Sequence, residues 1–338
     1  MQRMMRWLAI VFAAVSLVAC GDGGGSRATA FNTGVGGNGG GGGGNGGAGG
    51  ITNAIWEVQD YTADFNSTLT QLNAQGARGY LYVSGLALVS GSTTTPPRNV
   101  YVKDSNNTFT YEILPNQSAR ADFLAQMNAQ GARGFDFYGP TTVGTIYVKR
   151  SGSSATYNHQ LLDYVATTSN FLTQVNAQGA SGYFFSGNYI FSPVGGAEYV
   201  TIYTKASDSN SAFAYRLEPY QDSSTSTFVA QANTQGQQGY AFIGSNIFTD
   251  EPNAADNSRN IYVKDTTQSA NFSWKVMDYR STFDDFLAQA NAEGAQGSFY
   301  TGSAVFFPNG ISAPILTVNV YAKPSNCSGI LCRASGGF

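Results

Sequence analysis

Histidine is almost missing from this chain, and cysteine is scarce. One histidine, His159, and three cysteines occur among 338 residues. Most zinc sites take their ligands from clusters of these residue types, so the composition argues against a His/Cys metal centre, and we expect no metal or other cofactor. Charged residues make up 12% of the chain, the net charge is −3, and the basic residues are scattered. Nucleic acids bind to basic patches, so we expect no nucleic-acid partner.

The first twenty residues have the pattern of an export signal. Arg3 and Arg6 precede an apolar run over 7–15, which is typical of a secretory signal peptide. The run leads into Leu17-Val-Ala-Cys20, which resembles the lipobox of bacterial lipoproteins. This resemblance implies cleavage before Cys20, lipidation of Cys20 with palmitate as one of the acyl chains, and, because Gly21 follows, an outer-membrane location. The alternative is an ordinary signal peptide with a chance cysteine.

The segment 21–50 consists almost entirely of glycine with a few small polar residues. It has too little apolar surface to fold, so we expect a flexible tether with a reach of about 30 Å. A phosphate-binding loop is excluded, because no strand precedes the glycines and no Lys-Ser/Thr follows them.

Five copies of the pattern Q-x-N-x-[QE]-G-x-x-G follow, which identifies a repeat protein. Apolar residues before each copy have helical spacing, so the pattern predicts the end of an amphipathic helix. We expect the first glycine to be the left-handed residue after the helix, and the second to allow close approach of the next strand. The asparagine is either a ligand group or, as we favour, a partner for backbone groups near the turn. The fixed residues are Asn73, Gly76 and Gly79; Asn128, Gly131 and Gly134; Asn176, Gly179 and Gly182; Asn233, Gly236 and Gly239; and Asn291, Gly294 and Gly297.

Each repeat is predicted to contain a strand, a helix and two more strands. In the first copy these are 55–61, 62–75 with Thr62 or Asp64 at its N-cap, 79–89 and 98–103. Short polar turns between copies predict hairpins, so the third strand of one copy should pair with the first strand of the next. The last strand, 315–323, would then pair with 55–61 and remove two exposed sheet edges. The predicted fold is α/β: five strand–strand–helix–strand units closed into a pseudo-fivefold propeller.

Two further positions recur in every repeat. The first strand carries an aromatic residue at one place, and His159 occupies that place in the third copy, so we expect a structural histidine rather than a catalytic or metal-binding one. The third strand ends in Tyr-x-Lys, and its lysines are either an anion site or strand-end residues with packed stems and solvated charges. These lysines are Lys103, Lys149, Lys205, Lys264 and Lys323.

Two resemblances follow from these patterns. The stretch Leu72-Asn-Ala-Gln-Gly-Ala-Arg-Gly-Tyr80 is similar to the L-N-x-x-G-x-x-G-W motif of small uncharacterised bacterial βαββ domains, a family with no chemistry to carry over. The predicted topology resembles the pentein superfamily, which includes arginine deiminases and amidinotransferases. Pentein enzymes use a nucleophilic cysteine, a histidine and acidic residues, and these cannot be placed on this sequence.

The C-terminal tail contains the two remaining cysteines, Cys327 and Cys332. An exported protein meets an oxidising compartment, so we expect them to form a disulfide. The expected domain organisation is a signal at 1–20, a tether at 21–50, a repeat domain at 51–323 and a tail at 324–338. The repeats lie near 51–104, 105–150, 151–206, 207–265 and 266–323.

The sequence favours a non-catalytic binding or scaffold module that is anchored by lipid in the cell envelope. The loops between the second and third strands differ in length on a constant frame, which is typical of a binding face in repeat proteins. Expected partners are the membrane, through the anchor, and an envelope protein or glycan. The alternative is a pentein-like or carboxylate-based hydrolase or transferase that uses Asp250, Glu251 and Asp256. A purely structural envelope protein is a third possibility. The variable loops are 90–99, 139–144, 192–198, 249–260 and 307–314.

Overall fold

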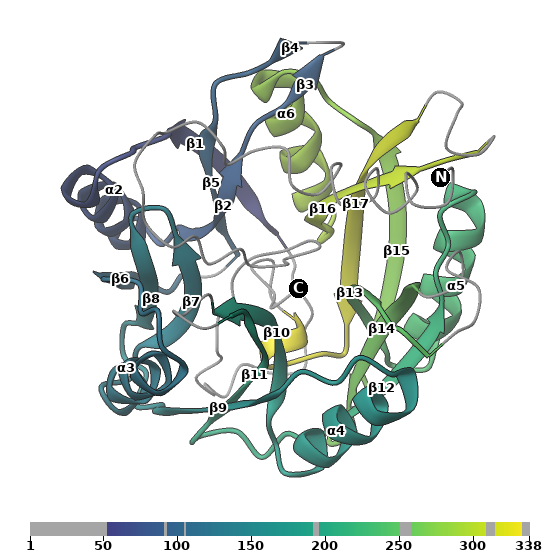
Figure 1. The fold of residues 1–338 in the computed structure, drawn as a ribbon. Helices are drawn as coiled ribbons and strands as arrows, with labels where there is room; N and C mark the ends of the chain where they lie inside the picture. Colours follow the sequence, from purple (N-terminus) through teal and green to yellow (C-terminus); the bar gives the residue numbers. More distant parts are fainter. Residues whose placement is uncertain are drawn as a thin grey trace.

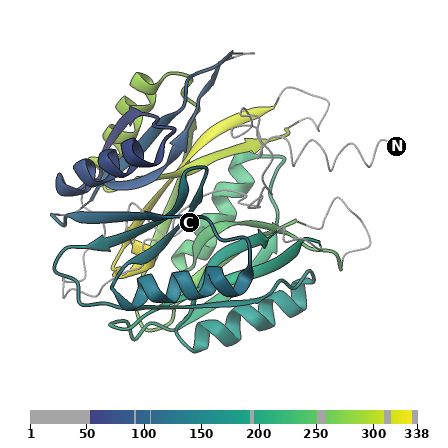
Figure 2. The same ribbon diagram turned by 60° about the vertical axis from the view of Figure 1, so that its left-hand side comes forward.

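A computed structural model describes residues 53–90, 93–104, 106–191, 196–250, 258–308 and 315–332. The predicted signal peptide, Cys20 and the glycine-rich segment lie outside these residues. Within them the chain is mixed α/β, with five helices and six small antiparallel sheets. Helices α2 to α5 lie at the outside of the view in Figure 1, with the strands nearer the middle, and Figure 2 shows the same ribbon turned by 60°.

Five similar units follow one another, each with the predicted order of strand, helix, strand, strand. The first also carries a small hairpin, β3 (Val89–Ser90) and β4 (Thr93–Thr94). The units comprise β1 (Ile55–Asp60), α2 (Phe65–Ala77), β2 (Leu81–Leu86) and β5 (Arg98–Lys103); β6 (Phe109–Leu114), α3 (Arg120–Ala132), β7 (Asp136–Thr141) and β8 (Gly144–Arg150); β9 (Tyr157–Asp163), α4 (Thr168–Ala180), β10 (Phe184–Phe191) and β11 (Glu198–Ala206); β12 (Phe213–Pro219), α5 (Thr225–Gln237), β13 (Ala241–Ile247) and β14 (Ser258–Asp265); and β15 (Asn271–Asp278), α6 (Phe283–Gly294), β16 (Phe299–Phe306) and β17 (Leu316–Ser325).

The third strand of each unit is the central strand of its sheet, between the first and second strands of the same unit. The predicted pairing with the next repeat is therefore wrong: β5 pairs with β1 and β2, not with β6. A short turn after the third strand leads to the first strand of the next unit, which belongs to a new sheet. The outer edge of that strand is covered by the helix of the preceding unit, as α2 covers β6. Because the third strand is central, the tyrosine of its Tyr-x-Lys pattern is completely buried in every unit. These tyrosines are Tyr101, Tyr147, Tyr203, Tyr262 and Tyr321.

The first and last units meet, but not through the predicted strand pair. Strand β17 pairs with β15 and β16, and β1 pairs with β5, so the expected pairing of 315–323 with 55–61 is wrong. Helix α6 packs against β1 instead, and Ala54 N donates to Gly294 O at 3.1 Å. The same helix-to-strand contact joins α2 to β6, α3 to β9, α4 to β12 and α5 to β15.

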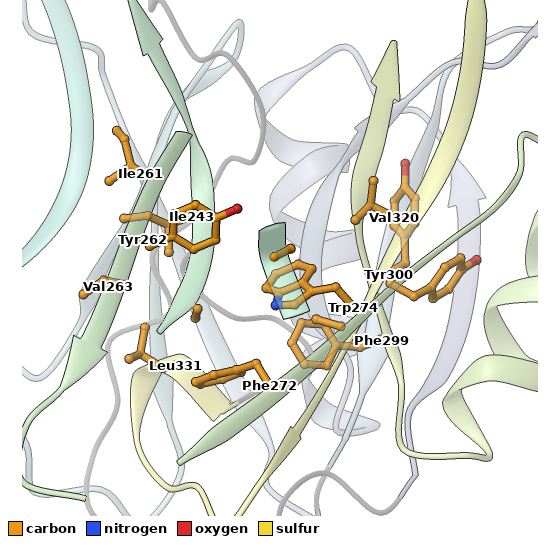
Figure 3. Packing of buried hydrophobic residues seen from close by; sticks show 14 of the residues in the cluster. Ile243, Ile261, Tyr262, Val263, Phe272, Trp274, Phe299, Tyr300, Val320 and Leu331 are labelled. Atoms are coloured by element: carbon orange, nitrogen blue, oxygen red, sulfur yellow. The ribbon is translucent and has the colours of Figure 1, made fainter. Parts of the chain in front are cut away.

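The chain after β17 folds back onto the core. Cys327 and Cys332 form the predicted disulfide, and the short helix η1 (Ile330–Cys332) lies within the loop that the disulfide closes. Leu331 is 2% exposed and belongs to the same apolar cluster as Phe272 and Ile243; Figure 3 shows it beside Phe272. The tail is thus part of the packed domain rather than a free extension.

Candidate functional site

The repeated asparagine joins each helix to the first strand of the following unit. Asn73 Oδ1 accepts from Tyr111 N at 2.8 Å, and Asn73 Nδ2 donates to Tyr111 O at 3.2 Å. The first strand is a sheet edge, whose outward N–H and C=O groups need partners. The side chain does bind backbone, but that backbone belongs to the next unit and not to the turn. The equivalent pairs are Asn128 with His159, Asn176 with Tyr215, Asn233 with Trp274, and Asn291 with Trp56.

The first glycine of the motif lies inside the helix, so its predicted left-handed role is wrong. A Cβ atom at Gly179 would lie 2.2 Å from Phe213 O, and one at Gly76 would lie 2.3 Å from Phe109 O. The missing side chain lets the helix touch the backbone of the next first strand. Gly131, Gly236 and Gly294 make the same approach.

The second glycine is the left-handed residue, so the two predicted roles are exchanged. Gly79 has φ +88°. Gly79 N donates to Gly76 O and Tyr80 N donates to Gln75 O, both at 3.0 Å, which is the hydrogen-bond pattern of a Schellman C-cap. Gly134, Gly182, Gly239 and Gly297 also have positive φ.

The first glutamine of the motif has a role that the sequence reasoning missed. Tyr101 Oη donates to Gln71 Oε1 at 2.9 Å, and Gln71 Nε2 donates to Asp60 O at 2.8 Å. The helix thereby holds the buried tyrosine of the central strand and the end of the first strand. The signal was available, because glutamine and tyrosine are both invariant among the five copies. The other pairs are Gln126 with Tyr147, Gln174 with Tyr203, Gln231 with Tyr262, and Gln289 with Tyr321.

The repeated lysines bind the C-termini of the helices. Lys103 Nζ donates to Arg78 O at 2.9 Å, and its stem lies 3.2 Å from the position of a Cβ at Gly79. A cation at this end complements the helix dipole. In four of the five lysines the stem packs as expected, and the ammonium group stays exposed while it donates to a carbonyl at the end of the helix, a partner that was not predicted. Lys149, Lys205 and Lys264 donate to Arg133 O, Ser181 O and Gln238 O; Lys323 is exposed.

The single histidine is buried in the aromatic position of β9. His159 is 2% exposed, its Nδ1 lies 3.0 Å from Thr204 Oγ1, and its ring contacts Phe137 edge-on. Burial lowers the pKa of His159 to about 3, so the imidazole is neutral near pH 7. Among the described residues, no group of three His, Cys, Asp or Glu side chains could hold a metal ion.

Of the three loop carboxylates proposed for catalysis, Asp250 is the one that lies within the described residues. Asp250 accepts hydrogen bonds from Thr168 N at 2.8 Å and Thr168 Oγ1 at 2.6 Å. Asp250 therefore caps α4 of the preceding unit, and these hydrogen bonds lower its pKa. Glu251 and Asp256 lie outside the described residues.

Exposed apolar side chains collect at one end of the units, here called the loop face. At this end the first and second strands of each unit finish, and the helices and third strands begin. The residue after the first strand occupies an equivalent position in each unit: it is Tyr61, Asn116, Tyr164, Tyr220 or Tyr279. The opposite end, which carries the five lysines, is the lysine face. Among the described residues, Ile55 is the one exposed large apolar side chain at the lysine face. Those at the loop face are Tyr61, Phe65, Val89, Tyr199, Tyr220, Ile315 and Leu316.

The two faces also differ in charge. Carboxylates outnumber cations at the loop face, whereas cations outnumber carboxylates at the lysine face. The five helix N-termini, each equivalent to about half a positive charge, offset part of the loop-face excess. The loop face carries Asp60, Asp64, Asp122, Asp163, Glu198, Asp222, Asp250, Asp278, Asp284 and Asp285, against Arg98, Arg120, Arg259 and Arg280; the lysine face carries the five lysines, Arg78, Arg133, Arg150, Arg216 and Lys275, against Glu57, Asp104, Glu112, Asp136, Asp208, Asp265 and Glu293.

Comparison with known proteins gives no relative from which a function could be carried over. Within the described residues, no helix is long and apolar enough to cross a membrane. No protein family, no curated protein and no solved structure matches this chain.

Proposed function

We propose that the five units surround one axis as a pseudo-fivefold α/β propeller. Three contacts between the last and first units support this arrangement: Ala54 N with Gly294 O, Asn291 with the backbone of Trp56, and Val89 N with Tyr279 Oη at 2.8 Å. The asparagine contact repeats the one that joins each pair of consecutive units. The propeller therefore needs no strand exchange between its ends, because every unit completes its own sheet.

We infer that the protein is a non-catalytic binding or scaffold module of the cell envelope. One observation carries this inference: most of the repeated polar side chains are hydrogen-bonded to other groups of the domain, whereas exposed apolar side chains collect at the loop face. Apolar surface gathered on one side of a soluble domain is typical of an interaction site. The hydrolase alternative gains no support from Asp250, which caps a helix.

The anchor and the tether complete the proposal. Lipidation at Cys20 would fix the chain to the outer membrane, and the segment 21–50 would let the domain move away from the lipid surface. The described domain begins beside Ile55 at the lysine face, so the loop face lies at the end away from the chain's point of entry.

The binding proposal is tested by capture of envelope components with the full chain and two surface variants. We expect Tyr61→Ser/Tyr220→Ser to lose the captured component, and the matched lysine-face change Ile55→Ser to retain it. Equal capture by all three proteins would reject the loop face as the binding surface. The anchor is tested by palmitate labelling in cells, which should vanish in Cys20→Ala and persist in Cys332→Ala; label that remains in Cys20→Ala would exclude the lipoprotein assignment.

A further inference from the structure

The carboxylates at the loop face are not equally available. Asp60 lies 3.6 Å from Arg98 Nε, and Asp163 Oδ1 accepts from Arg120 Nη1 at 2.6 Å. Asp278 and Asp284, in the fifth unit, are exposed and have no ion pair within the described residues. Asp64 and Asp122 of the first two units are also exposed without an ion pair. Within the described residues, units four and five together carry more loop-face carboxylates outside ion pairs than the other three, among them Asp222, Asp278 and Asp284, so most of the open negative charge lies on the last two units.

Exposed apolar side chains lie on the same two units as this open charge. Tyr220 of unit four is 36% exposed, and Leu316 of unit five is 42% exposed. The ends of the two units are joined, because Phe307 N donates to Asp222 O at 2.6 Å. A partner of units four and five would thus meet carboxylates and apolar surface together.

The chain itself shows which group suits such a surface. Arg98 of the loop face lies between the carboxylate of Asp60 and the ring of Phe283, with its Cζ 5.2 Å from the ring centroid. Guanidinium groups gain from both contacts, because a carboxylate supplies charge and an aromatic face supplies a cation–π interaction. Lysine and arginine stems also cover apolar surface while their charged heads stay in water.

We propose that the loop face of units four and five binds a basic polypeptide segment. Its arginine or lysine heads contact Asp222, Asp278 and Asp284, and its stems cover Tyr220 and Leu316. The excess of negative charge at this face speeds the approach of a cationic partner and turns it towards this end of the molecule. This inference rests on the proposed binding role of the loop face and specifies the chemistry of the partner.

The test uses the full chain and a fluorescent twelve-residue peptide of alternating arginine and serine, with a glutamate–serine peptide as the charge control. Binding is followed by anisotropy at about 50 mM and about 300 mM salt, and we expect the arginine peptide to bind at least about 10-fold more weakly at the higher concentration. Asp278→Asn should weaken binding about 3-fold, and combined Asp222→Asn, Asp278→Asn and Asp284→Asn about 20-fold. Leu316→Ser should weaken binding at both salt concentrations.

The matched control is Asp208→Asn, which removes the same charge from a turn at the lysine face and should leave Kd within about 2-fold. Equal weakening by Asp208→Asn and Asp278→Asn would show that only net charge matters and would overturn the proposal, as would absence of binding. A neutral labelled oligosaccharide tests the other class of partner. If it binds the wild-type protein, and Tyr220→Ser abolishes that binding while Asp278→Asn does not, the ligand is a glycan and not a basic polypeptide, although the loop face is still the binding surface. If the full chain captures an envelope component and no loop-face variant reduces that capture, the proposed function of the loop face is itself rejected.

Discussion

Asn291 and Trp56 are 235 residues apart in the sequence, yet two hydrogen bonds join them, from Trp56 N to Asn291 Oδ1 at 2.7 Å and from Asn291 Nδ2 to Trp56 O at 3.2 Å. Asn73 and Tyr111, in consecutive units, make the same pair of bonds. The contact between the two ends of the domain is thus equivalent to an internal one. The asparagine side chain hydrogen-bonds the outward N–H and C=O groups of an edge strand, so no further strand has to pair there.

Removal of this asparagine should destabilise the domain. Asn291→Ala leaves a backbone N–H and C=O of β1 without partners, so we expect a loss of about 2 kcal/mol in the free energy of unfolding. Asn73→Ala should cost a similar amount, because its two bonds are the same. Denaturant titration measures both, with exposed Asn66→Ala on α2 as the control. A negligible effect of Asn291→Ala beside a large effect of Asn73→Ala would contradict the equivalence of the two contacts.

The helical glycine should tolerate no side chain. Gly179→Ala places a Cβ 2.2 Å from the carbonyl oxygen of Phe213, so helix and strand must separate, and we expect a loss of at least about 3 kcal/mol in unfolding free energy. Gly152→Ala is the comparison. Its Cβ meets nothing within 4 Å, although its φ is +76°, so that change should cost only about 1 kcal/mol. Thermal or denaturant unfolding ranks the two variants, and a milder effect at Gly179 would show that the close approach is dispensable.

The one motif position that alternates between glutamine and glutamate has a charge explanation. Glu112 accepts from Arg133 Nη2 and from Gln130 Nε2 in unit two, whereas Glu293 replaces that glutamine in unit five and pairs with Lys275. Glu293 is 6% exposed, so Lys275→Met would leave a buried charge without its partner and should cost about 2 to 3 kcal/mol. Adding Glu293→Gln should restore much of that loss. A double variant no more stable than Lys275→Met in denaturant titration would disprove the coupling.

His159 should make the stability of the domain depend on pH. Burial lowers its folded-state pKa to about 3, against about 6.5 in an unfolded chain. Between these values the unfolded state binds a proton that the folded state does not, so stability is full above about pH 6.5 and falls as the pH drops towards 3. The histidine contribution should be about 2 kcal/mol between pH 7 and pH 5.

The matching variant is His159→Tyr, because tyrosine occupies the same position in two other units as Tyr111 and Tyr215. Unfolding free energies of both proteins at several pH values isolate the histidine contribution, since the carboxylates are common to both. Parallel pH curves for wild type and variant would contradict the buried neutral histidine.

Strand β17 should be essential for folding, although for a different reason from the one the repeat pattern suggested. It is the central strand of the fifth sheet and carries the buried Tyr321. Deletion of 315–323 removes most of the one strand that pairs with both β15 and β16, so we expect loss of the cooperative unfolding transition or association of the exposed edges. Circular dichroism and gel filtration provide the readout, and a cooperative monomer after deletion would show that the sheet does not need its central strand.

The local part of this fold was readable from the sequence. Apolar spacing before Leu72 predicted α2, and Asp64, one of two candidate N-caps, accepts from Ser67 N at 2.9 Å. The disulfide was predicted from two cysteines five residues apart in a chain that we expect to be exported. The glycines were recognised as fixed, but Gly76 and Gly79 were given each other's role, because both roles exclude a Cβ and spacing alone does not say which residue meets another strand.

The sequence by itself determined the five units, their element order and the local groups that must be satisfied, since hydrophobic period and turn residues act over a few positions. Only the tertiary structure decided that each third strand is central to its own sheet, that each asparagine bonds the next unit, and that apolar and acidic side chains share one face. These depend on which segments meet in space, and short turns are compatible with either strand pairing. The edge of each first strand could be satisfied by a strand or by an asparagine side chain, and packing of the preceding helix selected the side chain.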